Sequence, residues 1–305
     1  PPPLPSCPGI GDDDGAACSA ESSNALLQHT ARVAVKPHLE VAALTSEQQS
    51  LVCLLRKKVP MQSYLGNLSG LSSFDRCAVV ANSGALLAHN HGAEIDSHDA
   101  VFRFNGAPTK GYEKWVGSKE TVNLMHHSAY DDYLKWHKIT SMNDYKSFIL
   151  WLDNRGEPRS QVPVDMASRH LFTFVNKSAF DQFQEALGGI FAQRWHDGAG
   201  VKGKVFLPTS GSLGMLIAMS QCKSVDAYDM SESEASAKSH YHYYPPVGEL
   251  SASDNNFHIM FEAEHELWAR VSSTPRAESF KTGKATYPGF ASFSCDDAPS
   301  PNVIP

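Results

Sequence analysis

The sequence predicts an α/β fold, in which a single Rossmann-like domain holds a mostly parallel central sheet with helices on both faces. Short apolar runs alternate along the chain with stretches of helical periodicity, and this alternation is typical of parallel sheets covered by helices. The composition supports one sizeable core, since 42% of the 305 residues are hydrophobic and 19% are charged. These proportions exclude collagen, coiled coils and wholesale disorder.

The helices and strands are expected where the hydrophobic periodicity changes. Strands are predicted at the short apolar runs 77–80, 100–104, 121–125, 148–152, 171–175, 205–207 and 225–228. Helices are predicted over 179–195, 212–222 and 256–271. In such sheets ligands bind beyond the carboxyl ends of the strands, so functional residues are expected in the loops that follow them.

Residues 1–45 are rich in Pro, Gly, Ser, Ala and Asp and show little periodicity, which predicts a poorly structured stem or linker. The compact domain is then expected over 46–305. The chain carries 33 Asp and Glu against 26 Lys and Arg, a formal net charge of −7, so we expect no nucleic-acid partner. No apolar run reaches the roughly 18 residues that a membrane-spanning helix needs.

The cysteines are widely spaced, at Cys7, Cys18, Cys53, Cys77, Cys222 and Cys295. None belongs to a CxxC pair, so thiolate ligation of a metal is not expected. Disulfides fit the spacing better, and buried reduced thiols are the alternative. The sequons at Asn67 and Asn176 are candidate glycosylation sites, which agrees with a secretory compartment.

Three patterns look like functional motifs but lie in the wrong context. Residues 198–203 match the GxGxxG fingerprint of dinucleotide sites, yet a predicted helix precedes them and a predicted strand follows, the reverse of what such a site needs. The acidic triplet 12–14 lies in the low-complexity tail. His240, His242 and His258 lack the carboxylates or thiolates of a zinc site. No metal or other cofactor is therefore expected.

The first segment with chemical content is a buried strand that runs into a turn of small residues, RCAVVANSG at 76–84. Such a turn lets a ligand approach the backbone closely and offers amide donors to it. The block GAEIDSHDAVFRFNGAPTKGYEKWVGSKETVNLM follows at 92–125. Together they resemble the large sialylmotif of the eukaryotic sialyltransferases, glycosyltransferase family 29. The short sequences RCAVV, EIDSHDAV, RFNGAP and VGSK are most similar to those of the β-galactoside α-2,6 branch.

The second segment, PTSGSLG at 208–214, enters an apolar helix. Hydroxyls and glycines at a helix N-terminus favour an anion, because unpaired amides and the helix dipole both attract negative charge. An N-capped helix of the core is the alternative interpretation. With CKSVDAYDM at 222–230, the segment is similar to the small sialylmotif, whose Ser and Gly contact the donor sugar.

Further segments follow in the order of that family. HYHYY at 240–244 is similar to its third motif and FHIMFE at 257–262 to its very small motif, while GKATYPGF at 283–290 is similar to its C-terminal end. Two positions depart from the pattern. Pro245 replaces the acidic, amide or Trp residue that is more usual there, and Glu262 lies one position closer to His258 than the usual Glu. Ala263 holds the usual position and Glu264 lies one further.

The resemblance implies roles for individual residues. His258 is the expected base, and Glu262 at i+4 either supports it or belongs to an ordinary surface pair. His242, Tyr243 and Tyr244 are expected to stabilise the departing phosphate, with simple packing as the alternative for the tyrosines. The other donor-binding candidates are Asn82, Ser83, Asn105, Thr209, Ser210, Gly211 and Ser212. The asparagines are expected to hold the nucleotide, and 210–212 the sialic acid carboxylate.

The resemblance also implies a disulfide framework. Cys77 is expected to pair with Cys222, and Cys53 with Cys295. Cys7 and Cys18 would either close a local loop or link chains.

The function that the resemblance implies is transfer of sialic acid from CMP-sialic acid to the terminal galactose of a glycoprotein or oligosaccharide. The reaction would invert the anomeric centre, need no metal and form an α-2,6 linkage. The fold would be a variant of the GT-A glycosyltransferase fold. The protein would work in the Golgi lumen as a type II membrane protein, held by an anchor outside this sequence. Two alternatives stay open: transfer of another CMP-linked keto-deoxy sugar acid such as Kdo, and a catalytically silent glycan-binding module.

Overall fold

The structure is a computed structural model that describes residues 44–58, 74–126, 148–152, 172–174, 209–244, 261–292 and 294–296. Helices and strands alternate through these ranges, which confirms the α/β class. The predicted helix 179–195 and the predicted strand 205–207 lie outside the described residues, as does the tail 1–43.

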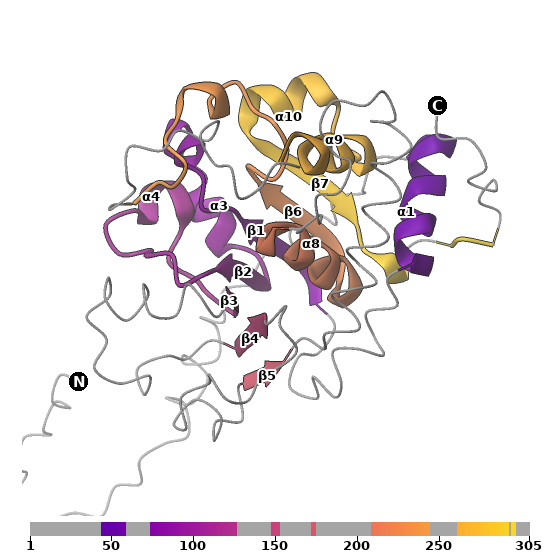
Figure 1. The fold of residues 1–305 in the computed structure, drawn as a ribbon, viewed down its shortest axis with the longest axis horizontal. Helices are drawn as coiled ribbons and strands as arrows, with labels where there is room; N and C mark the ends of the chain where they lie inside the picture. The colour runs from indigo at the N-terminus through magenta and orange to yellow at the C-terminus, as the bar shows by residue number, and fades with distance from the viewer. Residues whose placement is uncertain are drawn as a thin grey trace, which may run out of the picture. The chain divides into compact units, whose positions relative to one another are not determined.

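The strands form a seven-stranded sheet in the order β5-β4-β3-β2-β1-β6-β7 (Figure 1). Their bounds are β1 Phe74–Val80, β2 Ala100–Phe104, β3 Val122–His126, β4 Phe148–Leu152, β5 Phe172–Phe174, β6 Cys222–Tyr228 and β7 Lys284–Pro288. Every neighbouring pair from β5 to β6 is parallel, and β7 runs antiparallel to β6. The central strand β1 pairs Cys77 with Ala100 of β2 and with Val225 of β6.

The observed strands follow the predicted ones closely, except at the edge. The segment 284–288 was not predicted as a strand, because Lys and Pro interrupt its short apolar pattern. It becomes β7 because helix α10 (Arg276–Thr282) ends at Gly283, whose φ of 65° lets the chain reverse direction beside β6. Helix α8 also begins earlier than predicted, at Ser210, and its last residue, Gln221, leads directly into β6.

One face of the sheet is covered by three helices. Helix α8 (Ser210–Gln221) lies across the central strands, and α1 (Ser46–Lys58) and α9 (Phe261–Val271) complete this layer (Figure 1). All but the ends of α8 are buried, because the helix is apolar all around and not only along one stripe. The face contains the larger of two hydrophobic clusters, with Phe102 of β2 and Trp268 of α9 fully buried.

The opposite face carries a second, smaller core. Alternate strand residues point to it, so Ala78 and Val80 of β1 belong to this cluster while Cys77 and Val79 belong to the other. It is covered by short elements: the 3-10 helix η1 (Gly84–Ala88), α3 (Gly92–Asp96) and α4 (Glu113–Val116). Helices therefore cover both faces of the sheet. The 3-10 helices η3 (Ser236–Lys238) and η5 (Phe290–Ser292) lie in the connections.

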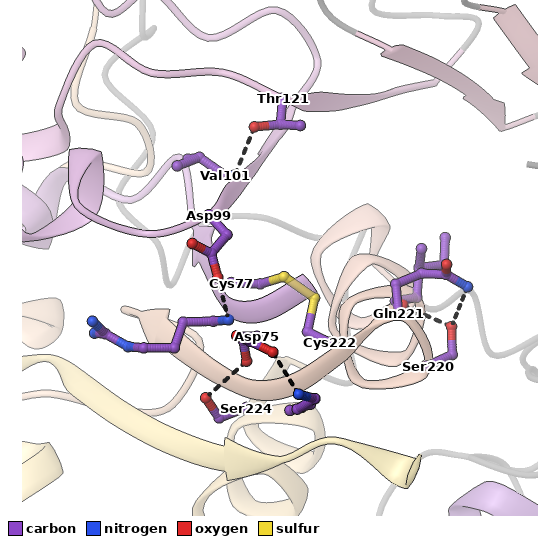
Figure 2. Close-up of a disulfide and its surroundings, with 12 residues drawn as sticks. Asp75, Cys77, Asp99, Val101, Thr121, Ser220, Gln221, Cys222 and Ser224 are labelled. Atoms are coloured by element: carbon purple, nitrogen blue, oxygen red, sulfur yellow. Dashed lines mark hydrogen bonds and ion pairs between the residues drawn. A yellow bond between two sulfur atoms is a disulfide. The ribbon is translucent and has the colours of Figure 1, made fainter. Parts of the chain in front are cut away.

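Two disulfides tie distant parts of the domain together, in the pairing that the resemblance implied. Cys77 of β1 bonds to Cys222 at the start of β6, and both side chains are buried (Figure 2). Cys53 of α1 bonds to Cys295 near the C-terminus. Within the described ranges, no helix has the length and apolar character needed to cross a bilayer.

A buried carboxylate in β6 links this strand to its neighbours β1 and β7 and to the residues just before β2. Asp226 of β6 accepts hydrogen bonds from His98 (3.0 Å), Arg76 (3.3 Å) and Thr286 (2.6 Å), and Lys284 lies 3.3 Å away. Burial alone would raise the pKa of Asp226, but the His98 hydrogen bond, the Lys284 charge and the Thr286 hydroxyl together hold it well below its usual range. His98 therefore ties the segment 92–99 to β6 through its hydrogen bond to this buried carboxylate.

Candidate active site

The strand order changes direction at β1. From β1 the chain continues to β2 on one side of it, and the strand on its other side, β6, comes much later in the sequence. Ligands of open α/β sheets bind at such a point, outside the carboxyl ends of the strands. Three loops meet there: 82–84 after β1, 105–106 after β2 and 229–230 after β6. The predicted donor-binding asparagines, Asn82 and Asn105, are therefore both at this edge.

The segment 240–244 is docked on the loop after β1 through backbone hydrogen bonds. The Gly84 N–H donates to the carbonyl of His240 (3.0 Å), and the Tyr243 N–H donates to the carbonyl of Asn82 (2.9 Å). A Cβ at Gly84 would lie 2.5 Å from the His240 carbonyl oxygen, so only glycine permits this approach. The third predicted motif therefore lies directly against the first.

Tyr243 also connects this segment to the loop after β2. Its side chain is 5% exposed, packs edge-on against Tyr112, and donates its hydroxyl proton to the carbonyl of Pro108 (2.9 Å). Burial raises the pKa of the phenol well above its usual range. These contacts show that Tyr243 packs between the two segments and directs its hydroxyl proton to Pro108. Its predicted role toward the leaving phosphate stays a prediction.

The Asn82 side-chain amide links the loop after β1 to β2 and to the segment 240–244. Its Nδ2 donates to the carbonyl of Phe104 (3.3 Å) and to the hydroxyl of Tyr244 (3.4 Å). The carbonyl fixes the orientation of the amide, because only an N–H can face it. The Oδ1 atom is then a buried acceptor that has no hydrogen-bond partner among the described residues. A buried acceptor of this kind costs free energy unless a donor reaches it.

His242 lies flat against Tyr244, with ring centroids 5.0 Å apart and planes 3° from parallel. Burial lowers the pKa of His242 to about 4. The imidazole is therefore neutral near pH 7, and it can offer one N–H donor and one acceptor but no positive charge.

Asn105 has a backbone conformation that is rare outside glycine. Its φ is 53° and that of Gly106 is 65°, so two consecutive residues are left-handed. The turn is held by the Asn105 N–H, which donates to the Leu124 carbonyl (2.9 Å), and by the Gly106 N–H, which donates to Oδ1 of Asn123 (3.3 Å). Asn123 is completely buried in β3. The side-chain amide of Asn123 in β3 thus helps to hold the turn that contains Asn105.

The cap of α8 is held by an acidic side chain of the protein itself, and burial raises the pKa of that residue, Glu264. Glu264 of α9 accepts hydrogen bonds from the N–H and hydroxyl of Thr209 (2.8 and 2.6 Å) and from the hydroxyl of Ser212 (2.6 Å). Trp268 Nε1 donates to the same serine oxygen (3.0 Å), and Thr209 caps the helix through the Ser212 N–H (3.0 Å). The carboxylate is 3% exposed.

This network shows where the three residues predicted for the sialic acid carboxylate lie. The Ser212 side chain is completely buried and its hydroxyl donates to Glu264, whereas its predicted contact with the donor sugar stays a prediction. Ser210 and Gly211 are partly exposed in the first turn and remain candidates for donor contact. A Cβ at Gly211 would meet the methyl end of Met230 at 2.9 Å, which places this turn beside the loop after β6.

The sequence predicted that the backbone N–H groups of the turn after β1 would be donors for a ligand, but two of them have partners within the protein. The Gly84 N–H is used by His240, and the Ala85 N–H donates to the hydroxyl of Ser83 (3.1 Å). Ser83 is thus the N-cap of η1. Contacts from this turn to a ligand would therefore come from Asn82 more than from the amides of 84–85.

Several predicted residues fall outside the described residues. His258, Pro245, Asn67, Asn176, Cys7 and Cys18 do so entirely. Glu262 lies in the first turn of α9, but its side chain is not among those described. The roles predicted for these residues stay predictions. Across the described ranges, no group of three or more His, Cys, Asp or Glu side chains is arranged to hold a metal ion.

The structure adds two acidic residues that were not predicted for the site, Glu264 and Asp229. Both are buried, at 3% and 7% exposed. Glu264 had a recognisable signal: it is four positions before Trp268 and three before Leu267, on the apolar side of α9. Asp229 had none, because a single acidic residue after a strand reads as an ordinary turn.

The sequence of this chain matches a known protein family. Residues 20–274 match the family model described as glycosyltransferase family 29 (sialyltransferase). The chain is 33% identical over 241 residues to β-galactoside α-2,6-sialyltransferase 2 of Homo sapiens. This alignment covers 75% of this chain and 44% of the relative. It is 28% identical over 229 residues to the human β-galactoside α-2,6-sialyltransferase 1, covering 72% of this chain and 55% of the relative.

The chain thus spans about half the length of the curated relatives that it matches. Among solved structures, it is similar to one titled as a crystal structure of a mammalian sialyltransferase. That similarity has a TM-score of 0.43 and 22% identity, and covers 74% of this chain and 77% of the other.

Proposed function

Since this chain belongs to glycosyltransferase family 29, the sialyltransferases, we propose that it transfers sialic acid from CMP-sialic acid to the terminal galactose of a glycan. We propose the α-2,6 linkage, because the similar curated relatives are named β-galactoside α-2,6-sialyltransferases. Among the described residues, the loop after β1, the loop after β2 and the segment 240–244 contact one another at one edge of the sheet, and this convergence supports the proposal most strongly.

The donor side of the proposal rests on Asn82. Its buried Oδ1 has no donor among the described residues, and a cytidine nucleotide carries hydroxyl and amino donors that could supply one. Tyr244 and His242 stack beside this amide and present aromatic and polar surface to the same edge. A nucleotide bound across the ends of β1 and β2 would contact Asn82 and Asn105 together.

The chemistry that we propose is a single displacement. The acceptor hydroxyl oxygen attacks C2 of sialic acid, the bond from C2 to the phosphate oxygen breaks, and CMP leaves with that electron pair. His258 is the proposed base that receives the proton of the acceptor hydroxyl. His242 is proposed as a neutral N–H donor to the departing phosphate, since its lowered pKa of about 4 keeps it uncharged. Attack opposite the leaving group inverts the anomeric carbon, and we propose that no metal takes part.

The remaining features of the proposal concern the whole protein. We propose that residues 1–45 are a stem and that 46–305 form the catalytic domain, a Rossmann-like variant of the GT-A fold with a mostly parallel sheet. The five parallel strand pairings support this assignment. We further propose that the protein acts in the Golgi lumen as a type II membrane protein, to which the two disulfides are suited.

The proposal is tested by mass spectrometry of a reaction that contains CMP-sialic acid and an N-acetyllactosamine acceptor, with and without EDTA. Equal product in both, resistant to an α2,3-specific sialidase, supports a metal-independent α-2,6 transferase. Product from CMP-Kdo instead of CMP-sialic acid would change the donor assignment. CMP binding without any product would indicate a silent module.

The proposed base is tested by His258→Ala, which should keep CMP affinity and lose most turnover. His240→Ala is the matched control. Its side chain is exposed, and its contact with Gly84 uses only the backbone carbonyl, which alanine retains. Turnover of His258→Ala equal to that of His240→Ala would refute the base assignment.

A further inference from the structure

The loop after β2 begins with a tight turn over residues 104–107. Its two central residues, Asn105 and Gly106, are both left-handed, and the Ala107 N–H donates to the Phe104 carbonyl across them (3.0 Å). Two left-handed central residues are characteristic of a type I′ turn, for which Asn-Gly is the preferred pair. The hydrogen bond that closes such a turn does not use the N–H of the second central residue, which needs an acceptor from elsewhere.

The neighbouring strand supplies this acceptor. The Gly106 N–H is buried and donates to Oδ1 of Asn123 in β3 at 3.3 Å, and Asn123 itself is completely buried. Nδ2 of the same amide donates to Oε2 of Glu120 at 3.0 Å. An ionised carboxylate can only accept hydrogen bonds, so Glu120 determines which end of the Asn123 amide is its donor end. The oxygen end therefore faces the turn.

Two other contacts hold the first half of the turn. The Asn105 N–H donates to the Leu124 carbonyl (2.9 Å), which continues the β2–β3 ladder one step past β2. Nδ2 of Asn82 donates to the Phe104 carbonyl (3.3 Å). Asn123 instead holds the central peptide, the one that joins Asn105 to Gly106. The orientation of this peptide determines how Asn105 is presented at the edge of the sheet.

We propose that Asn123 is a positioning residue for the donor substrate: its buried amide fixes the central peptide of the turn 104–107 and so places Asn105 for the nucleotide. The proposal rests on the proposed function, in which Asn105 helps to hold the CMP part of CMP-sialic acid. Asn123 is completely buried, so it does not contact the nucleotide itself. It acts through the backbone of Asn105 and Gly106, and its effect is on ground-state binding.

Three variants separate the hydrogen bonds of Asn123 from its packing. Asn123→Leu keeps a similar volume, removes both hydrogen bonds and leaves the buried Gly106 N–H without its acceptor. Asn123→Asp keeps an acceptor but places a second carboxylate against that of Glu120. Combining Asn123→Asp with Glu120→Gln exchanges the roles of the pair, because the glutamine amide donates and the aspartate accepts from both of its neighbours. This exchanged pair has the same net charge as the wild type.

Two further variants provide the references. Thr121→Val is the matched control, since Thr121 Oγ1 accepts from the Val101 N–H (3.0 Å) at the other end of the β2–β3 pair. It removes one side-chain acceptor of a backbone N–H between the same two strands and leaves the turn 104–107 unchanged. Asn105→Gly removes the side chain that is proposed to meet the nucleotide, and glycine tolerates the positive φ at this position.

The test measures CMP affinity by calorimetry together with KM and kcat for CMP-sialic acid. Asn123→Leu and Asn123→Asp should each weaken CMP binding and raise this KM by about tenfold, with kcat changed less than about threefold, because the lost interaction concerns binding. The exchanged pair should recover to within about threefold of the wild type, and Thr121→Val should stay within about twofold. In an Asn105→Gly background, Asn123→Leu should add less than about twofold, since both changes interrupt one path.

The outcomes separate this role from the proposed function. If the wild-type chain binds no CMP, the proposed function fails and this role fails with it. If the wild type binds CMP and Asn123→Leu binds it equally well, only the role of Asn123 is refuted. An equal loss in Thr121→Val, additive losses from Asn123→Leu and Asn105→Gly, or no recovery in the exchanged pair would each show that Asn123 only stabilises the fold. Should Asn123→Leu fail to fold, Asn123→Asp and the exchanged pair decide.

Discussion

The carboxylate of Glu264 accepts a hydrogen bond of 2.6 Å from the hydroxyl of Ser212, a residue 52 positions earlier in the chain. This bond joins the first turn of α8 to α9, the helix that begins three residues after His258. Glu264 also accepts hydrogen bonds from the N–H and hydroxyl of Thr209, the residue that caps α8. The first turn of α8 and the helix α9 are therefore held together by a buried acid.

Replacing Glu264 should destabilise the domain. Glu264→Ala leaves the hydroxyls of Ser212 and Thr209 and the Thr209 N–H without their acceptor. We expect a loss of about 2–4 kcal/mol in the free energy of unfolding, measured with urea, since buried unsatisfied donors are costly. Glu266→Ala on the same helix removes only partly exposed ion pairs with Arg270 and Arg276, and should cost less than about 1 kcal/mol. Similar losses in the two variants would contradict the structural role of Glu264.

Gly84→Ala should separate the segment 240–244 from β1. The new Cβ would lie 2.5 Å from a backbone oxygen of His240, which cannot move aside as a side chain can. We expect a lower melting temperature and roughly tenfold weaker CMP binding, because Asn82 and Tyr244 lose their shared position.

Gly211→Ala provides the comparison for melting temperature. Its Cβ would lie 2.9 Å from the flexible methyl end of Met230 and in ordinary contact, at 3.4 Å, with the Thr209 hydroxyl. Alanine also favours helix formation over glycine by roughly 0.5–1 kcal/mol. Its melting temperature should stay near the wild-type value or rise. A Gly84→Ala variant that melts as the wild type does would mean that the contact with His240 is not tight.

His242 should titrate near pH 4 when its imidazole is followed by NMR, because burial opposes its charge. A histidine whose folded pKa lies below its unfolded value of about 6.5 binds more protons when unfolded. Stability therefore falls as pH decreases from about 6.5 to about 4. His242→Phe keeps an aromatic ring beside Tyr244 and should remove up to about 3 kcal/mol of that pH dependence. A measured pKa of about 6.5 would instead indicate a solvated ring.

The two disulfides should differ in their accessibility to reductants. Cys77 and Cys222 are 0% and 2% exposed, whereas Cys53 and Cys295 are partly exposed. Mild reduction followed by alkylation and mass spectrometry should therefore label Cys53 and Cys295 first, because exchange requires access of the attacking thiolate to the sulfur. Earlier labelling of Cys77 would contradict the buried position of its bond to Cys222. Replacing both Cys77 and Cys222 by serine should cost about 2–5 kcal/mol.

The central strands could be predicted from sequence because each is a short apolar run bounded by polar residues. β2 and β4 were predicted at their observed bounds, 100–104 and 148–152. The edge strand 284–288 could not be, since its structure depends on pairing with β6 and not on its own pattern.

Asn82 and Asn105 were selected because they match the family's motifs. Both follow strands that are neighbours in the sheet, and the structure brings their loops together. The roles of Ser212 and Tyr243 were not predictable, because they depend on which partner takes the single hydroxyl proton. That partner, Glu264 or Pro108, comes from a segment far away in sequence.

The pairing of β1 with β6 has a consequence for biosynthesis. Cys77 leaves the ribosome 145 residues before Cys222, so it cannot form its native bond until those residues have been made. During that time β1 lacks a neighbour on its β6 side, and an apolar strand edge is a place where nascent chains associate with one another. Cys53 also emerges long before its own partner, Cys295, so early oxidation could pair either thiol with another early cysteine instead of its native partner. Production of active protein therefore depends on an oxidising compartment that also reshuffles disulfides, and yields should rise when a disulfide isomerase is co-expressed.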